Sequence, residues 1–242
     1  MATEHREPAF WALIPAAGVG QRMGADRPKQ FLRLGSRSVL EYTLDIFLEH
    51  PAIRGVVVVL GAGVDPGAVD LPDAEGRLFL VTGGAERADS VRSGLAFLAQ
   101  QGRPDDWVLV HDAARPCLSP GDLDHLIGVL RDDPVGGLLV AASTDTLKLA
   151  DHDGRVERTL DRRRVWRALT PQMFRLHALH VALEAASASG LPVTDEASAM
   201  EFVGQQPRLV EGSPMNIKIT RPEDLDVAEV YLIRQQRLRS AR

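Results

Sequence analysis

Cysteine is nearly absent from this sequence, since its 242 residues contain Cys117 and no other cysteine. A lone cysteine excludes an intramolecular disulfide and is typical of proteins from reducing compartments. No apolar run approaches the ~20 residues that a membrane-spanning helix needs. The opening residues MATEHREPAF are too charged for a secretory signal. We therefore expect a soluble, cytoplasmic protein without a membrane partner.

Positive charge is also in short supply: 28 Lys and Arg stand against 33 Asp and Glu, a formal net charge of −5. This balance argues against a general nucleic-acid binder but leaves room for a local basic pocket. With 45% hydrophobic and 25% charged residues, the chain has the composition of a globular protein with a sizeable core. It contains no internal repeat or linker, so we predict a single domain over residues 1–242.

The first half of the chain alternates between two kinds of apolar pattern. Unbroken apolar runs indicate strands that are covered on both faces. Between them, apolar residues recur at helical spacing. This alternation predicts an α/β fold with a mostly parallel central sheet and helices on its faces. The expected strands are 10–16, 55–60, 78–81, 107–112 and 137–143, and the expected helices are 38–50, 87–100 and 119–133.

The pattern changes after Ser143, where an arginine-rich segment with an Asp-Gly pair at 153–154 interrupts it. Alternating residues on both sides of this pair predict an extended β-hairpin arm over about 143–172. A helix is expected from about Arg175, then the segment VTDEASAMEFV, and a short strand near 208–212. The spacing of Thr220 and Glu223 predicts a capping box at the start of a final helix. Ser119, Pro120 and Asp122 likewise give a capping pattern at the start of the helix expected over 119–133.

The loop after the first expected strand carries glycines at positions 18, 20 and 24. Their spacing is neither the dinucleotide fingerprint nor a Walker A motif. Glycine spacing alone leaves a tight turn and a phosphate cradle as equal alternatives. The nearby cations Arg22 and Lys29 favour a polyphosphate, because ligands of open α/β sheets bind where strands end. Arg27 we assign to the solvated surface.

The segment VHDAARP ends another expected strand. Asp112 could ligate Mg²⁺ or cap the next turn, and beside a phosphate loop it is the preferred metal candidate. We expect His111 to pack or hydrogen-bond locally, while His177 and His180 lack partners at zinc-ligand spacing. No catalytic motif surrounds Cys117 to mark it as a nucleophile, and the G-x-S-x-G motif of serine hydrolases does not occur. If the attacking group is a phosphate of the substrate, the protein needs no activated side chain as nucleophile. The second pKa of a phosphate lies near ~6, so the group is already largely ionised at neutral pH.

Taken together, eight blocks between Pro15 and Leu225 resemble the 2-C-methyl-D-erythritol 4-phosphate cytidylyltransferase family, and they stand in the family's order. Eight blocks in order are highly specific, whereas one would be weak. The blocks are PAAGVGQRMG, PKQF, GGAERADSV, VHDAARP, DTLK, LDRRRVWRALTPQ, TDEASA and NIKITRPEDL.

The resemblance implies a Rossmann-like nucleotidyltransferase fold whose arm builds a homodimer. It also implies that CTP and 2-C-methyl-D-erythritol 4-phosphate react, with Mg²⁺, to give the CDP-methylerythritol and pyrophosphate, in non-mevalonate isoprenoid synthesis. By motif position, the triphosphate would be held by Gly18, Gly20, Arg22 and Lys29, of which Arg22 and Lys29 would stabilise the transition state. The cytosine and its ribose would contact Ala16, Ala17, Gly84 and Ser90. The reacting centre would include Asp112 and Arg115. The methylerythritol phosphate would be bound by Lys218 and Thr194, and by Thr146 and Arg162 from the partner's arm. The run Arg162–Arg164 leaves open which arginine enters the site.

Three alternatives stand beside this interpretation. A sibling cytidylyltransferase acting on another polyol phosphate, such as ribitol 5-phosphate, would differ mainly around the acceptor residues. A nicotinamide-dependent Rossmann dehydrogenase is disfavoured by the glycine spacing. A non-catalytic nucleotide sensor is disfavoured by the intact pair of Arg22 and Lys29.

Overall fold

A seven-stranded sheet forms the centre of the computed structural model, which describes residues 6–18, 28–69, 71–72 and 74–240. Its strand order is β11-β7-β10-β6-β1-β4-β5, with β10 antiparallel to both of its neighbours and the other neighbours paired in parallel. The mostly parallel sheet expected from the sequence is thus confirmed. The strands are β1 (Phe10–Ala16), β4 (Ile53–Leu60), β5 (Leu78–Thr82), β6 (Trp107–Val110), β7 (Gly136–Ala142), β10 (Trp166–Arg175) and β11 (Arg208–Glu211).

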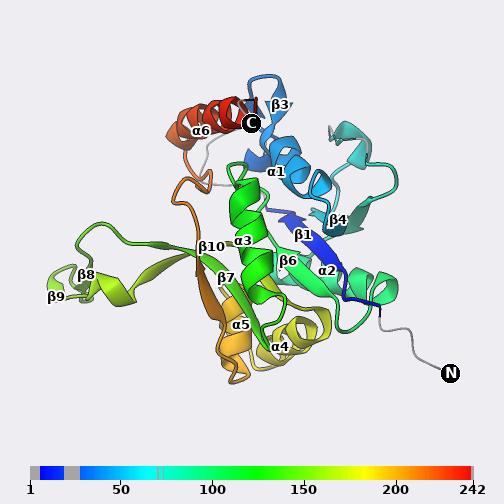
Figure 1. Ribbon diagram of the computed structural model, residues 1–242. Coiled ribbons are helices and arrows are strands. Elements are labelled where there is room, and N and C mark those ends of the chain that lie inside the picture. The colour runs from blue at the N-terminus through cyan, green and yellow to red at the C-terminus, as the bar shows by residue number, and fades with distance from the viewer. Residues whose placement is uncertain (1–5, 19–27, 70, 73, 241–242) are drawn as a thin grey trace.

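Helices cover both faces of this sheet (Figure 1). Successive side chains of a strand point to opposite faces, so Ile14 of β1 packs into one core while Leu13 packs into the other. The first core is completed by α1 and α3, and the second by α2, α4 and α5. The helices are α1 (Val39–Leu48), α2 (Arg87–Gln101), α3 (Pro120–Leu130), α4 (Leu176–Ala188), α5 (Glu196–Phe202) and α6 (Glu223–Ser240).

The order in which the chain adds strands to the sheet reverses at β1, which pairs with β4 on one side and with β6 on the other. The chain runs outward from β1 through β4 to β5 and then returns to β6. Open α/β sheets bind ligands beyond the carboxyl ends of their strands at such a switch point. The loops after β1 and β6 therefore meet where a ligand site is expected.

Two helix starts test the capping patterns. Ser119 caps α3 as the sequence predicts, because its hydroxyl accepts a hydrogen bond from Asp122 N at 3.0 Å. The predicted capping box of Thr220 with Glu223 is wrong. Helix α6 begins at Glu223, and it is the Asp224 carboxylate that accepts from Thr220 N at 2.8 Å. The helix starts later than the motif requires, so the next acidic residue takes the cap.

The arm projects away from the body of the molecule (Figure 1). Its two strands, β8 (Lys148–Ala150) and β9 (Val156–Thr159), pair antiparallel around a turn in which Gly154 has φ of 76°. All of β9 is exposed. The segment expected as the arm divides in two, because residues from 166 onward belong to β10 of the main sheet.

Small elements without a sequence signal complete the fold. They are the two-residue strands β2 (Arg33–Leu34) and β3 (Arg37–Ser38) and the short 3-10 turns η2 (Lys29–Phe31), η3 (Pro66–Ala68) and η4 (Arg162–Arg164). Within the described ranges, none of the helices has the combination of length and apolar character needed to cross a membrane.

Candidate active site

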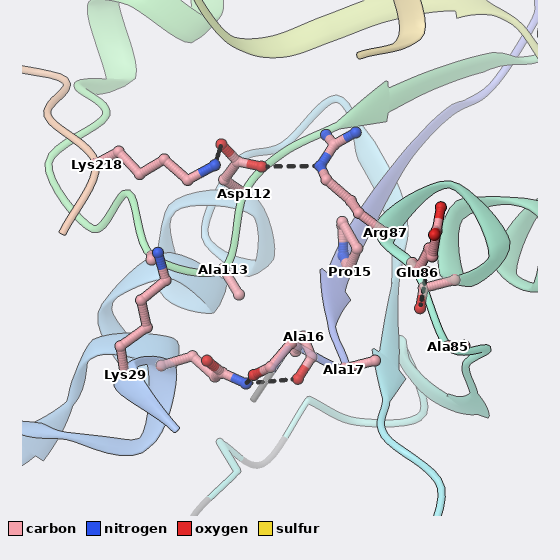
Figure 2. A pocket seen from close by; sticks show the side chains of 14 residues that line it. Pro15, Ala16, Ala17, Lys29, Ala85, Glu86, Arg87, Asp112, Ala113 and Lys218 are labelled. Atoms are coloured by element: carbon pink, nitrogen blue, oxygen red, sulfur yellow. Dashed lines mark hydrogen bonds and ion pairs between the residues drawn. The ribbon is translucent and has the colours of Figure 1, made fainter. Parts of the chain in front are cut away.

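A cleft of about 620 Å³ opens beyond the carboxyl ends of β1 and β6 (Figure 2). It is walled by the loops that follow these strands, by the turn into α2, and by one lysine from the segment before α6. Its lining residues are Pro15, Ala16, Ala17, Gly18, Lys29, Gln30, Ala85, Glu86, Arg87, Ser90, Asp112, Ala113, Ala114 and Lys218.

The loop after β1 is held in place by Gln30, which is 3% exposed. The Gln30 side-chain amide donates to the carbonyl oxygens of Ala16 at 2.7 Å and of Gly18 at 2.9 Å. The same short turn, η2, brings the neighbouring Lys29 to the cleft. Backbone and cation thus line one wall together. The expected site residues Gly20 and Arg22 lie outside the described residues.

Asp112 lies among three cationic side chains. Its carboxylate pairs with Lys218 Nζ at 2.9 Å, Arg87 Nε at 3.2 Å and Arg115 Nε at 3.3 Å; Figure 2 shows it between Lys218 and Arg87. Burial favours the neutral acid, but Arg87, Lys218 and Arg115 outweigh burial and hold the pKa of Asp112 well below its usual range. The carboxylate is therefore ionised at neutral pH.

A chain of hydrogen bonds fixes the backbone at Asp112. Asp112 N donates to Thr170 Oγ1 at 3.1 Å, and this hydroxyl is 2.9 Å from His111 Nδ1. His111 Nε2 is 3.0 Å from the carbonyl oxygen of Arg115, so the ring hydrogen sits on Nε2 and Nδ1 accepts from the hydroxyl. Burial lowers the pKa of His111 to about 4, which keeps the ring neutral. His111 hydrogen-bonds locally, as expected from the sequence.

A second cavity of about 630 Å³ adjoins the first. It shares Arg87, Asp112 and Lys218 with the first cavity, so these side chains form the boundary between the two. The rest of its lining comes mainly from β10 and from the residues just before α5. Those further residues are Arg115, Ala168, Leu169, Thr170, Gln172, Thr194 and Asp195.

Most of the described residues that the sequence singled out gather in these two cavities. Ala16, Ala17, Gly18, Lys29, Ser90, Asp112 and Lys218 line the first, and Arg115 and Thr194 line the second.

Gly84 is outside both linings but precedes Ala85 of the first. A Cβ at this glycine would lie 2.4 Å from Asp89 Cβ, so no larger residue fits in the turn.

Two expected site residues lie on the arm. Arg162 donates through Nη1 to the carbonyl oxygen of Thr144 at 2.6 Å, a contact within the arm itself. Neither Arg162 nor Thr146 lines the two cavities of its own chain. Within the described part of one chain, the arm is therefore separate from the site.

Sequence reasoning missed several polar residues of the site, among them the cavity-lining Gln30, Arg87 and Thr170. It also missed Glu196, which pairs with Arg87. Each of these residues lies inside a motif that the sequence analysis quoted. Their presence in a recognised motif was therefore the only sequence signal for these residues. Motif position does not show which side chains contact one another in the fold. Arg87 and Glu196, for example, pair across a separation of 109 residues.

Comparison with known proteins identifies the family of this chain. The family model of 2-C-methyl-D-erythritol 4-phosphate cytidylyltransferase matches residues 10–234. The chain is similar to the curated 2-C-methyl-D-erythritol 4-phosphate cytidylyltransferase of Pseudomonas paraeruginosa, with 61% identity over 90% of this chain and 94% of that protein. The enzyme of the same name from Pseudomonas putida is 59% identical, over 90% of this chain and 94% of that one.

Solved structures are similar as well. The crystal structure of 2-C-methyl-D-erythritol 4-phosphate cytidylyltransferase from Francisella tularensis has a TM-score of 0.80 and 34% identity, covering 92% of this chain and 99% of that one. The enzyme of the same name from Thermus thermophilus has a TM-score of 0.72 and 32% identity, covering 93% and 98%.

Proposed function

Because the chain belongs to the 2-C-methyl-D-erythritol 4-phosphate cytidylyltransferase family, we propose that its two adjoining cavities hold the two substrates of that reaction. The chain is a nucleotidyltransferase of isoprenoid precursor synthesis. It transfers a cytidylyl group to 2-C-methyl-D-erythritol 4-phosphate, giving 4-diphosphocytidyl-2-C-methyl-D-erythritol. CTP is the donor in this proposal, and pyrophosphate is the other product.

The reaction joins two anions. A phosphate oxygen of the acceptor attacks the α-phosphorus of CTP, the bond from that phosphorus to the bridging oxygen breaks, and pyrophosphate leaves with the electron pair. The acceptor phosphate needs no activating base, because its second pKa near ~6 leaves it largely ionised at neutral pH. Positioning and neutralisation of charge are the tasks left to the protein. The cations around Asp112 suit these tasks.

The first cavity suits the nucleotide. In our proposal Lys29 and the backbone at Gly18 bind the triphosphate, together with Gly20 and Arg22, which lie outside the described residues. The nucleoside then lies against Ala16, Ala17, Gly84 and Ser90. Ser90 is 1% exposed and its hydroxyl donates to Glu86 O at 3.1 Å, so it is fixed within the wall. Lys29 and Arg22 stabilise the charge that develops on the transferred group.

The second cavity suits the acceptor. Arg115 and Lys218 supply positive charge there, and Thr194 supplies a hydroxyl group. We assign Thr146 and Arg162 to the site of a neighbouring copy, with a homodimer formed through the arm. Neither residue lines the two cavities of its own chain, and the arm projects away from the body of the molecule (Figure 1), which supports this assignment.

Asp112 fits a role as the protein ligand to Mg²⁺. It is ionised, and among the described residues its Oδ1 accepts a single hydrogen bond, from Arg87. The described part of the chain holds no cluster of three or more metal-ligating side chains. Such a cluster is not needed for nucleotide chemistry, since Mg²⁺ is commonly held by one or two carboxylates and the substrate phosphates. When bound, Mg²⁺ neutralises triphosphate charge and polarises the reacting phosphoryl group.

The observation that carries the proposal is the meeting of the two cavities at Asp112, Arg87 and Lys218. The test is pyrophosphate release measured with each of the four ribonucleoside triphosphates and 2-C-methyl-D-erythritol 4-phosphate, with and without Mg²⁺. We expect turnover with CTP that depends on the acceptor and on Mg²⁺. Ribitol 5-phosphate serves as the matched acceptor control, and faster turnover with it would overturn the assigned acceptor.

A further inference from the structure

Glu196 is a buried carboxylate to which the roles above give no task. It is the first residue of α5 and is 1% exposed. Both of its oxygens accept hydrogen bonds from Arg87, Oε1 from Nη1 at 2.7 Å and Oε2 from Nη2 at 3.0 Å. Burial of a carboxylate costs free energy even when it is paired. Such a pair therefore invites a functional explanation.

Arg87 connects this buried pair to the site. It is the first residue of α2, and its Nε donates to Asp112 Oδ1 at 3.2 Å (Figure 2). Its side chain lines both cavities. A guanidinium group has five N–H donors, and the bonds to Glu196 and Asp112 use three of them. Two donors are left at the boundary between the cavities, as far as the described residues show.

Two fixed carboxylates determine the plane of this guanidinium. A free arginine side chain samples many rotamers, and ordering it costs conformational entropy. Paired bidentately with Glu196 and through Nε with Asp112, the guanidinium has its orientation set before any ligand arrives. Its positive charge is also maintained, since the carboxylates Glu196 and Asp112 outweigh the effect of burial and raise the pKa of Arg87.

The backbone of Glu196 is itself anchored to the sheet. Gln172 of β10 accepts from Ala197 N at 2.7 Å and donates to Asp195 Oδ2 at 2.9 Å. Asp195 in turn caps α5, because its carboxylate accepts from Ser198 N at 2.9 Å. Glu196 thus lies between two residues held by one sheet side chain. A rigid support of this kind is what precise positioning of a site group requires.

We propose that Glu196 is a positioning residue for the transfer, which acts by holding Arg87 across the boundary of the two cavities so that its two remaining N–H donors face the anions that meet there. This inference rests on the proposed function of the cavities. The donors act mainly on charge that develops when the two anions react. Loss of their alignment should therefore lower kcat more than it raises KM.

The central variant is Glu196→Gln, which keeps the size of the side chain but places an NH₂ group against one Arg87 nitrogen. We expect kcat to fall at least tenfold, with KM for CTP and for the acceptor within about threefold of wild type. Glu196→Asp keeps the charge and should recover part of the lost kcat. Glu184→Gln is the matched control, because Glu184 also forms a bidentate pair with an arginine of α2, accepting from Arg92 Nε at 2.7 Å and Nη2 at 3.1 Å, away from both cavities.

A double-mutant cycle shows whether Glu196 acts through Arg87. In the Arg87→Ala background, Glu196→Gln should lower kcat no more than about twofold further. If the two effects multiply, or if Glu196→Gln alone leaves kcat within twofold of wild type, the inference is overturned. Thermal unfolding of each variant separates loss of kcat from loss of folded protein. If Glu196→Gln does not fold, Glu196→Asp and Arg87→Lys must each lower kcat for the inference to stand.

The failure of the proposed function would look different. In that case the wild-type protein itself would release no pyrophosphate from CTP and 2-C-methyl-D-erythritol 4-phosphate.

Discussion

At the scale of single residues, the site is a set of charges arranged before substrate binds. Lys218 and Lys29 line the same cavity, although they come from distant parts of the chain. Lys218 is held 2.9 Å from Asp112 by an ion pair, and Arg115 and Arg87 bind the same carboxylate. Preorganised cations of this kind stabilise developing charge without reorganising during the reaction. Removing one of them therefore tests its role directly.

Replacement of Lys29 tests the donor cavity. We expect Lys29→Ala to lower kcat about 100-fold, because the loss of one donor to developing charge costs ~3 kcal/mol. The folded state should be little affected, since Lys29 is only partly buried. Steady-state pyrophosphate release and thermal unfolding measure the two effects. Arg54→Ala is the control, because it removes an exposed cation near the amino end of β4. Near-normal kcat in folded Lys29→Ala would contradict the assignment.

Replacement of Lys218 tests the acceptor cavity. We expect Lys218→Ala to raise KM for 2-C-methyl-D-erythritol 4-phosphate at least tenfold and to leave the Kd of CTP within about twofold. The reason is that Arg87 and Arg115 still neutralise Asp112, whereas the acceptor phosphate loses a cation. Calorimetric titration with CTP checks the first half-site and acceptor kinetics check the second. A large loss of CTP affinity would move Lys218 to the donor side.

At the scale of elements, the arm is the part of the fold least able to support itself. It consists of two short strands, and its large apolar residue Val156 is 64% exposed. An isolated two-stranded hairpin is marginally stable in water and gains stability by packing on further structure. A second copy of the chain is the partner in our proposal, and a symmetric pair would exchange arms reciprocally.

Mixing of subunits tests whether Arg162 serves a neighbouring site. Lys29→Ala and Arg162→Ala chains should each be nearly inactive alone. In a mixed dimer, one site combines an intact Lys29 with the partner's intact Arg162, and the other site lacks both. Random reassortment of equal amounts should restore about a quarter of wild-type activity, given a symmetric two-chain interface. Absence of recovery, once native mass spectrometry has shown mixed dimers, would place the action of Arg162 elsewhere.

At the scale of the whole molecule, buried ionisable groups link the site to global stability. His111 is fully buried and neutral at the end of β6, and Asp112 beside it is buried and ionised. Both states depend on the folded surroundings. Protonation of either group therefore favours the unfolded chain, in which neither group is constrained.

The two groups destabilise the fold in different pH windows. The pKa of His111 falls from 6.5 in the unfolded chain to about 4 in the fold, so the unfolded chain binds the proton first. This contribution is fully present above pH 6.5, declines as the pH falls toward about 4, and amounts to about 3 kcal/mol. The pKa of Asp112 is also lowered, from 3.8 in the unfolded chain, so its contribution is lost only at still lower pH.

Urea unfolding as a function of pH checks the contribution of His111. Between pH 6.5 and 4, the free energy of unfolding should decline more steeply for the wild type than for His111→Gln, which cannot titrate. The comparison uses slopes, so a lower absolute stability of the variant does not affect it. The other six histidines are common to both proteins and cancel. Parallel slopes would show that His111 does not carry this pH dependence.

Local chemistry made much of the fold predictable. The apolar runs at 10–16 and 137–143 became β1 and β7 within a residue of the expected bounds, because strands buried on both faces need continuous apolar side chains. Ser119 capped α3 because its hydroxyl reaches an N–H only three residues ahead. The cap at Thr220 was misjudged, since two acidic residues compete there. The sequence likewise did not show that the arm rejoins the sheet at Trp166, where pairing with β7 decides.

The sequence by itself determined the fold class, most helix and strand positions before Ser143, and, through eight motifs, the family and its reaction. These depend on periodicity, on helix caps formed by residues close in sequence and on residue identity, all of which can be read from the sequence without knowing the fold. Only the tertiary structure decided that Arg87 binds Asp112, 25 residues away, and Glu196, 109 residues away. The physical reason is topological. Strands β5, β6 and β10 must first join one sheet before the loop after β6, helix α2 after β5 and helix α5 after β10 and α4 bring these side chains to one boundary between two cavities.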